Sequence, residues 1–472
     1  MATEQAEAPH TTKNDPPTIV PTQTYESVNQ QIGGIVLHGG VSFGWVASLL
    51  LAFGILMIFM LAITWLLVRG VGIWGINVPV AWGFAIVNFV WWIGIGHAGT
   101  LISAFLLLMR QDWRTSINRF AEAMTLFAVS CAGLFPLLHL GRPWLFYWLL
   151  PYPNTMSLWP QWRSPLVWDV FAVSTYLIVS LIFWYAGLIP DAATLRDRAR
   201  SRPGQLIFGV LALGWRGSAR HWQRYQRAYL LLAALATPLV VSVHSVVSLD
   251  FTVAIVPGWH STIFPPYFVI GAVFSGFAMV LTLAIPLRAI YRLQNLITMR
   301  HIEIMAKLLL ATGLGVSYGY LSEIFNSWYS GDQYEWAVTL NRAFGPDWPV
   351  FWLVMFCNVL TPHALWFRRV RTTVPLLFLV ALITNTGMWI ERYMIVVTSL
   401  SREFVTAAWH GFHGTIWDWL TLLGSFGLFF VLFILFVRLL PILPISEVRE
   451  LAWKVEGDRA QQDLAGKGAG DD

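Results

Sequence analysis

The sequence predicts an all-α membrane protein with about ten transmembrane helices. Of its 472 residues, 57% are hydrophobic and 12% are charged, whereas soluble proteins carry roughly 25% charged residues. The apolar residues form long runs, and the first clear run, 46–68, contains no charged residue. It exceeds the ~20 residues that a helix needs to cross a bilayer.

Hydropathy and length place the individual spans along the chain. Ten runs qualify, with expected limits at 45–68, 79–109, 120–140, 165–188, 228–250, 267–290, 302–325, 348–367, 374–398 and 415–440. Before them, residues 1–44 are polar and lack a basic stretch leading into an apolar core, so we expect an extended polar arm rather than a signal peptide. Residues 446–472 are predicted to form a charged helix and tail.

The arginines divide the connecting loops into two classes. They gather in the even-numbered loops, as in the fourth loop, which holds Arg196, Arg198, Arg200, Arg202, Arg216, Arg220, Arg224 and Arg227. The positive-inside rule therefore places these loops and both chain ends in the cytoplasm. The odd loops are rich in Trp, Tyr and Pro and nearly uncharged, which indicates either a surface covered by another protein or an aromatic interfacial belt.

The two cysteines limit the cofactors that this chain can hold. Cys131 and Cys357 both fall inside predicted spans, far apart in the sequence. They are too few for a disulfide scaffold or a Cys-ligated iron–sulfur cluster, and neither belongs to a Cys-x-x-Cys-His haem attachment motif. We expect both to be small apolar fillers.

Three ionisable residues lie at span ends on the predicted outer face. Span three ends at His139, span four begins near Asp169, and span five ends at Asp250. Ionisable groups at membrane depth mark functional paths by default. Oxidation of a quinol releases two protons, for which a histidine and a carboxylate are suitable bases. Each residue also has a structural reading, as an interface histidine, a helix-start charge, or a partner of Arg142.

Further polar residues lie deeper or on other spans and are candidates for a proton path. They are His97, Glu122, Glu323, Arg392 and Asp418. Paired structural charges are the alternative. We favour that alternative for Glu303 and Lys307, which are spaced i,i+4 on one span, and a functional role for His97.

Two other classes of membrane protein are less consistent with these patterns. A bis-histidine b-type haem needs two histidines at matched depth on facing helices, and His97 is expected to lie too deep to match His139 or His244. A solute transporter typically has broken helices and midplane charges, whereas these spans are mostly unbroken and their polar groups cluster toward one face.

The motifs around these residues resemble a known family. His139-Leu-Gly-Arg142-Pro, Asp169 at the start of the next helix, and the segment 257–267, Pro-Gly-Trp-His-Ser-Thr-Ile-Phe-Pro-Pro-Tyr, are similar to the NrfD/polysulfide-reductase membrane-subunit family. The resemblance covers roughly residues 30–445. Within the family, the chain is most similar to the ActC group, the quinol-oxidising subunits of bacterial alternative complex III.

The resemblance implies an architecture and a site. Spans two to five and six to nine would form two four-helix bundles flanked by spans one and ten, which divides the chain into 45–265, with the quinol-site bundle, and 266–445. His139, Asp169 and Asp250 would bind and deprotonate menaquinol or ubiquinol near the periplasmic face. We place the further substrate contacts at Arg142, Tyr152, Trp168 and His244.

The resemblance also implies partners in a bacterial inner-membrane complex. Electrons would pass to an iron–sulfur subunit on the periplasmic side and then to multihaem cytochrome c subunits, with a homologous second membrane subunit, small membrane subunits and lipids around the chain. This chain itself would hold no metal or haem, and no nucleic acid is expected. Two alternatives stay open: a paralogous structural anchor without a quinone site, and a redox-driven proton channel subunit.

Overall fold

The computed structural model describes residues 18–150 and 162–468, and all regular elements in these ranges are helices. Ten helical segments within the described residues are long and apolar enough to cross a membrane, which confirms the predicted fold class. They are α3 (Phe43–Arg69), α4 with its continuation (Phe84–Leu108), α6 (Asn118–His139), α7 (Pro165–Arg198), α9 (Ala219–Thr252), α10 (Phe264–Ile290), α11 (Met299–Tyr329), α13 with its continuation (Trp348–Trp366), α15 with its continuation (Val374–Thr398) and α16 (Ile416–Leu439).

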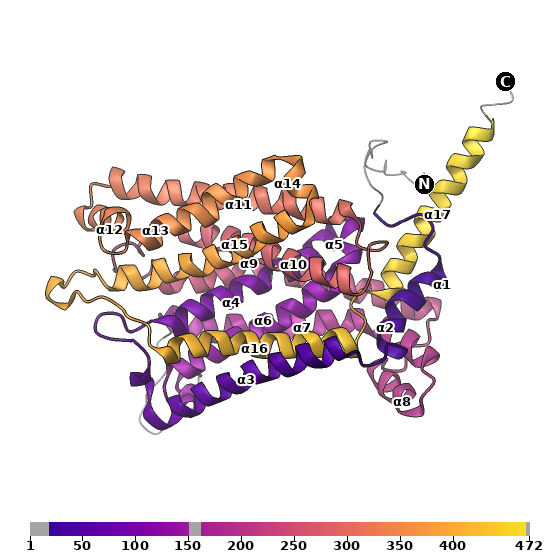
Figure 1. Ribbon diagram of the computed structural model, residues 1–472, viewed down its shortest axis with the longest axis horizontal. Coiled ribbons are helices and arrows are strands. Elements are labelled where there is room, and N and C mark those ends of the chain that lie inside the picture. Colours follow the sequence, from indigo (N-terminus) through magenta and orange to yellow (C-terminus); the bar gives the residue numbers. More distant parts are fainter. Residues whose placement is uncertain (1–17, 151–161, 469–472) are drawn as a thin grey trace.

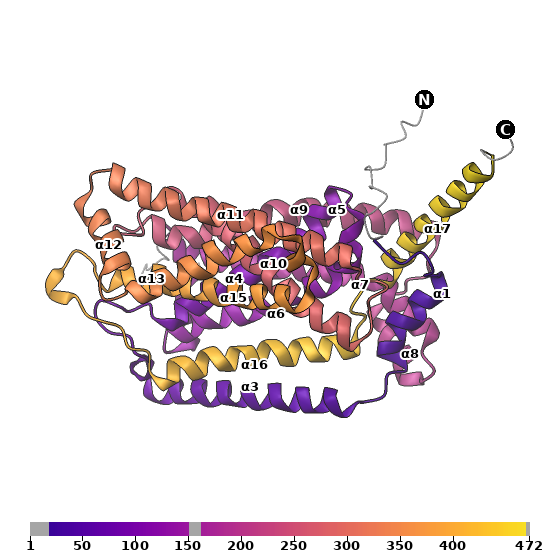
Figure 2. The same cartoon turned by 45° about the horizontal axis from the view of Figure 1, so that its top comes forward.

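The spans lie along the long axis of the molecule, which is horizontal in Figure 1, and successive spans run in opposite directions. Helices α4, α6, α7 and α9 pack together, as do α10, α11, α13 and α15, and α4 and α10 join the two groups. Helices α3 and α16 lie side by side along one edge (Figure 2). Burial follows this layout, because 78% of the apolar window of α4 is buried but only 17% of that of α3.

Two glycines allow the first and last spans to pack closely. A Cβ atom at Gly424 of α16 would overlap the Phe59 Cβ of α3, and one at Gly427 would overlap the Leu56 backbone nitrogen. Small residues at such an interface let two helix backbones approach, which is how van der Waals packing holds membrane helices together.

Shorter helices cover the two ends of the spans. They are α1 (Tyr25–Val28), α2 (Gly34–Leu37), α5 (Leu106–Leu108), α8 (Arg202–Leu211), α12 (Gln333–Phe344), α14 (Arg368–Thr372) and α17 (Ile445–Gly468). Helices α1, α2, α8 and α17 gather at one end, and α12 lies at the other (Figure 1). The end that carries α1 and α17 is therefore also the end of the arginine-rich fourth loop, as the alternation of loop charge predicts.

The segment before the first span differs from the extended arm that the sequence predicts. Residues 25–37 are helical, with a π-helical turn at Asn29–Gly33 between α1 and α2. A capping box between Thr24 and Ser27 starts α1, and such reciprocal bonds satisfy backbone groups that a helix start leaves open. Arg198 of α7 then holds Glu26 at 2.6 Å, so this segment is fixed to the first bundle.

The loop 253–263 fastens the two helix groups together at the opposite end. The Trp259 side chain is buried, and its indole nitrogen donates to the carbonyl of Ile395 at 2.6 Å. The backbone nitrogen of Gly258 donates to Glu335 of α12 at 2.9 Å. Burial raises the pKa of Glu335 above its ordinary value of 4.5. The aromatic residues of this motif therefore have a packing role in the fold.

Candidate functional site

A pair of carboxyl groups lies between α7 and α9. Asp169 is in the second turn of α7 and Asp250 is near the end of α9, and these two antiparallel helices pack against each other. Both side chains are 7% exposed. Their carboxyl groups are within hydrogen-bonding contact of each other. The Oδ1 atom of each is buried and has no hydrogen-bond partner among the described residues.

This arrangement is suited to exchanging protons. Two carboxylates in contact repel each other when both are ionised, so the pair is most stable when the two groups share one proton. Buried polar atoms are normally hydrogen-bonded, and the two unpartnered oxygens are therefore places where a polar ligand or water is expected. The pair offers an acceptor for one proton beside a donor for a hydrogen bond.

His139 lies at the same end of the bundle as the two aspartates but is not joined to them. It is the last residue of α6, is partly buried, and its Nδ1 atom has no hydrogen-bond partner in residues 18–150 or 162–468. No hydrogen bond or ion pair to Asp169 or Asp250 is present in those ranges. The structure thus brings the aspartates into contact and leaves His139 as a separate group at the same end.

The other residues predicted around the substrate have different surroundings. Arg142 is exposed, and among the described residues it makes no ion pair with Asp250. Trp168 is half-buried, and its indole nitrogen donates to the carbonyl of Trp162 at 2.7 Å. Tyr152 lies outside the described residues. The interpretation of Asp250 as a partner of Arg142 is therefore wrong, because Asp250 contacts Asp169 instead.

The two deeper histidines meet in the centre of the first bundle. The rings of His97 and His244 lie 4.4 Å apart between centres, edge to face, and both side chains are buried. The expectation that His97 lies too deep to match His244 was wrong. A haem needs its iron between two axial histidines, and these rings contact each other directly, which leaves no room for one between them. Neither ring nitrogen of His244 has a hydrogen-bond partner in the described part of the chain.

Polar groups continue from this histidine pair toward the arginine-rich end. The His97 ring lies 5.4 Å from that of Tyr176 on α7. The Tyr176 hydroxyl donates to the carbonyl of Gly96 at 3.0 Å and is 2.9 Å from the hydroxyl of Thr100. Directly after Thr100, the last residue of α4, the chain forms a π-helical turn at Leu101–Phe105. Such turns leave the regular backbone ladder and are frequent at functional sites.

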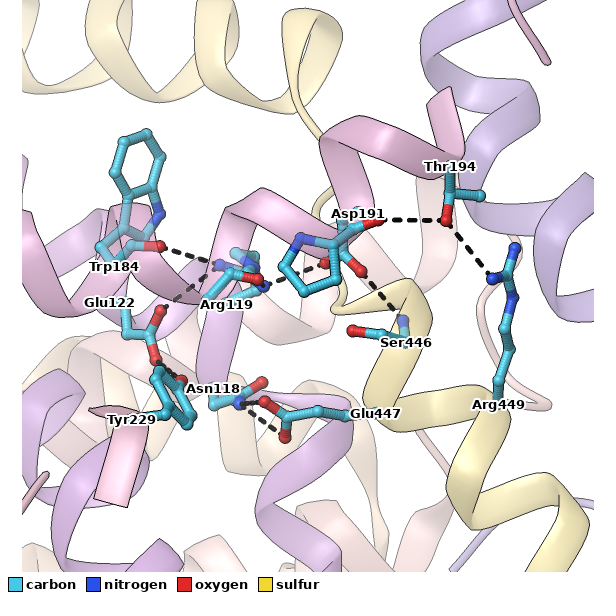
Figure 3. Close-up of polar contacts among 12 residues, drawn as sticks. Asn118, Arg119, Glu122, Trp184, Asp191, Thr194, Tyr229, Ser446, Glu447 and Arg449 are labelled. Carbon is cyan, nitrogen blue, oxygen red and sulfur yellow. Dashed lines mark hydrogen bonds and ion pairs between the residues drawn. The ribbon is translucent and has the colours of Figure 1, made fainter. Parts of the chain in front are cut away.

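The series of polar residues ends in a buried charged cluster (Figure 3). The Tyr229 hydroxyl donates to Glu122 at 3.2 Å, and Ser103, one turn beyond Thr100, also contacts Glu122. Arg119 lies 3.9 Å from Glu122 and 3.0 Å from Asp191. These contacts place Glu122 between the histidine pair and the end of α7.

The remaining predicted path residues have local partners elsewhere. Glu323 pairs with Arg342 at 3.0 Å. Arg392 lies 3.6 Å from its neighbour Glu391, with its guanidinium 4.2 Å from the centre of the Phe268 ring. Asp418 accepts hydrogen bonds from the backbone nitrogens of residues 75 and 415, both at 2.8 Å, and so caps α16. None of these three contacts the Glu122 cluster in the described residues.

The structural reading of Glu303 and Lys307 is confirmed, because they form an ion pair at 3.5 Å. Sequence reasoning missed Tyr176 and the Arg119–Asp191 pair. A single tyrosine in an apolar run gives no sequence signal for Tyr176. Arg119 and Asp191 are charged residues next to predicted spans, and that position is a signal from which the pair could have been found. No group of three or more His, Cys, Asp or Glu side chains in the described ranges is arranged to hold a metal ion.

Comparison with known proteins gives consistent matches. The sequence profile described as "Polysulphide reductase, NrfD" matches residues 74–403. The chain is 28% identical over 232 residues to a candidate membrane subunit of dimethyl sulfoxide reductase from Halobacterium salinarum, covering 47% of this chain and 49% of that protein. It is 24% identical over 211 residues to a selenate reductase subunit from Mesobacillus selenatarsenatis, covering 43% and 47%.

The aligned region thus spans about half the length of each of these relatives. The profile match is longer, and it contains the carboxyl pair, the histidine pair and eight of the ten spans. On that match, the chain belongs to the NrfD family of polysulphide-reductase-type membrane subunits.

Proposed function

We propose that this chain is the quinol-oxidising membrane subunit of an electron-transfer complex, similar in kind to the ActC group. The observation that carries the proposal is the buried Asp169–Asp250 contact, in which each carboxyl group has an oxygen without a partner among the described residues. The relatives are named as subunits of reductases, one of them as a membrane subunit. A membrane subunit of such a complex needs a lipid-soluble electron donor, and a quinol is one.

The proposed reaction balances two protons and two electrons. A quinol, menaquinol or ubiquinol, binds with one hydroxyl at the carboxyl pair and the other toward His139. The ionised carboxylate of the pair accepts one proton and His139 the second, while two electrons leave the ring, and the product is the quinone. A positioned base of this kind contributes typically 10²–10⁴-fold to a rate.

The electrons require a partner that accepts them one at a time. We propose an iron–sulfur subunit docked on the end that carries Asp169 and Asp250, followed by multihaem cytochrome c subunits. On the positive-inside rule this end is periplasmic, and the arginine-rich end with α1 and α17 is cytoplasmic. The chain would then be a multi-pass protein of a bacterial inner membrane, beside a homologous second membrane subunit and small membrane subunits.

A proton route through the first bundle is a further part of the proposal. The described polar groups run from His244 and His97 through Tyr176 to Glu122. Side chains or waters placed along such a series can pass protons between the two ends. This function is compatible with quinol oxidation and is favoured by the two unpartnered ring nitrogens of His244.

Turnover of the assembled complex tests the quinol site. We expect Asp169→Asn and Asp250→Asn each to lower kcat for a short-chain quinol, with ferricyanide as acceptor, by at least about 10²-fold. The matched control is Asp332→Asn, an exposed helix-capping aspartate, which should leave kcat unchanged. Size-exclusion chromatography establishes that the variant complexes assemble.

Unchanged turnover in both carboxyl variants would overturn the assignment and leave the structural anchor as the better reading. Haem staining of the co-purified subunits tests the finer assignment separately. Covalently bound haem supports the ActC-like arrangement, and its absence, with full quinol oxidation, favours a reductase partner instead.

A further inference from the structure

A cavity of about 910 Å³ opens at the arginine-rich end of the molecule. It lies between the loop after α5, the inner end of α7, the start of α9, and α17. Its size is in the range of small-molecule sites, which are typically 300–1,000 Å³. The Asp169–Asp250 pair lies at the opposite end of the bundle, so the cavity is distinct from the proposed quinol site.

The charges around the cavity leave an excess of cations. Four carboxylates line it, and each has a cation within 4.0 Å: Glu447 with Arg114, Asp197 with Arg196, and Asp112 and Glu450 with Lys454. Arg110, Arg216 and Arg449 also line it. In the described residues none of these three makes an ion pair, so six cations face four carboxylates and the lining carries an excess of two positive charges.

Arg114, which also lines the cavity, has a buried donor without a partner among the described residues. Arg114 is 6% exposed, and its Nη2 atom holds Glu447 at 2.8 Å. Its Nη1 atom is buried and has no hydrogen-bond partner among the described residues. Guanidinium groups with free donors recognise phosphate oxygens well, because their planar geometry matches two acceptor atoms.

Helix α8 indicates that this end lies at the depth of lipid headgroups. Phe208 and Leu211 turn toward the protein, while Leu206, Ile207 and Val210, on the opposite side of the helix, are 59–73% exposed. An apolar stripe facing away from the protein is typical of a helix lying in the membrane interface. Trp215 and Trp222, which line the cavity, stack edge to face nearby, as expected at the same depth.

We propose that this cavity binds the phosphate of an anionic phospholipid headgroup, with Arg110, Arg216 and the free Nη1 of Arg114 as the recognising groups. Basic pockets at the cytoplasmic ends of transmembrane helices are suited to such headgroups. Free phosphate has the same charge chemistry. The lipid is the source that the exposed stripe of α8 favours, because it places the cavity beside the leaflet.

Lipid binding to the full-length purified chain tests the proposal. The probes are phosphatidylglycerol, phosphatidylcholine and inorganic phosphate, and the readouts are native mass spectrometry and the lipid retained after detergent washing. We expect Arg110→Gln with Arg216→Gln to weaken phosphatidylglycerol binding about thirtyfold, from the interaction typical of two surface arginines. Arg220→Gln with Arg224→Gln is the matched control, since both are exposed arginines of the same region that do not line the cavity.

Three results separate the possibilities. Loss of phosphatidylglycerol in the cavity variant alone, with phosphatidylcholine unaffected, supports the lipid site. Equal loss in both variants means general attraction to a basic surface and overturns it. Displacement of phosphatidylglycerol by millimolar inorganic phosphate would overturn the lipid as the source and assign the cavity to free phosphate. Arg114→Lys keeps the positive charge near Glu447 but removes the planar guanidinium with its Nη1 atom, and should weaken binding severalfold.

Discussion

Replacing Arg119 with methionine tests how much the buried charged cluster contributes to stability. Arg119 is 1% exposed and donates to the carbonyls of Trp184 at 3.1 Å and Gly187 at 2.7 Å, and to Asp191 at 3.0 Å. Asp191 is fully buried, and its carboxylate also accepts a hydrogen bond from the backbone nitrogen of Ser446. Arg119→Met therefore strands a carboxylate in the interior, which costs about 3–5 kcal/mol.

The free energy of unfolding in mixed micelles, measured by titration with a denaturing detergent, gives this quantity. The matched control is Arg198→Met, because the Arg198–Glu26 contact is shorter, at 2.6 Å, but its side chains are 36% and 54% exposed. Solvent weakens such pairs strongly, so the control should change stability far less. A double variant, Arg119→Met with Asp191→Asn, should recover most of the loss, because residue 191 then carries no charge in the interior. Equal losses for Arg119→Met and Arg198→Met would refute the reasoning that burial, rather than distance, sets the magnitude.

Three further predictions concern packing, pH and proton movement. Gly424→Ala should lower the free energy of unfolding by about 1–3 kcal/mol, since its Cβ would overlap Phe59, whereas Gly54→Ala, with open space around it, should not. Because burial raises the pKa of Glu335, the folded state holds the carboxyl proton of Glu335 more tightly than the unfolded state does. The melting temperature of the unaltered protein minus that of Glu335→Gln should therefore fall as pH rises above 4.5, and a constant difference would contradict this. In proteoliposomes with a pH dye, Tyr176→Phe should slow proton transfer about tenfold or more. Tyr185→Phe, whose hydroxyl bonds the carbonyl of Leu211 away from the polar series, should leave the rate of transfer unchanged.

Hydropathy and charge were enough to predict the framework of this protein. Span length follows from bilayer thickness, and the arginine alternation orders the loops, so the helix count and the shared end of His139, Asp169 and Asp250 came from simple physical rules. The contact between the two aspartates was not predictable in the same way. It depends on the rotation of α7 and α9 about their axes, which the near-continuous apolar sequence of both helices does not specify.

Depth within the bundle was the main source of error. Distances to the predicted span ends place His97 and His244 at different depths, whereas their rings are in contact in the folded chain. The apolar run of the fourth span ends near residue 188 and so predicts Asp191 outside the span, whereas α7 continues to Arg198. Hydropathy locates the part of a helix that contacts lipid and not the part that extends beyond it.

The pairing of α3 with α16 has a consequence for biosynthesis. Helix α3 is complete once residue 69 has been made, yet the surface that covers its Phe59 face begins at residue 416. Within the described chain, few other helices contact α3. During translation α3 must therefore stay in the membrane with that face against lipid or insertion factors until α16 has been synthesised. Synthesis of α16 supplies the surface that fixes α3 in place.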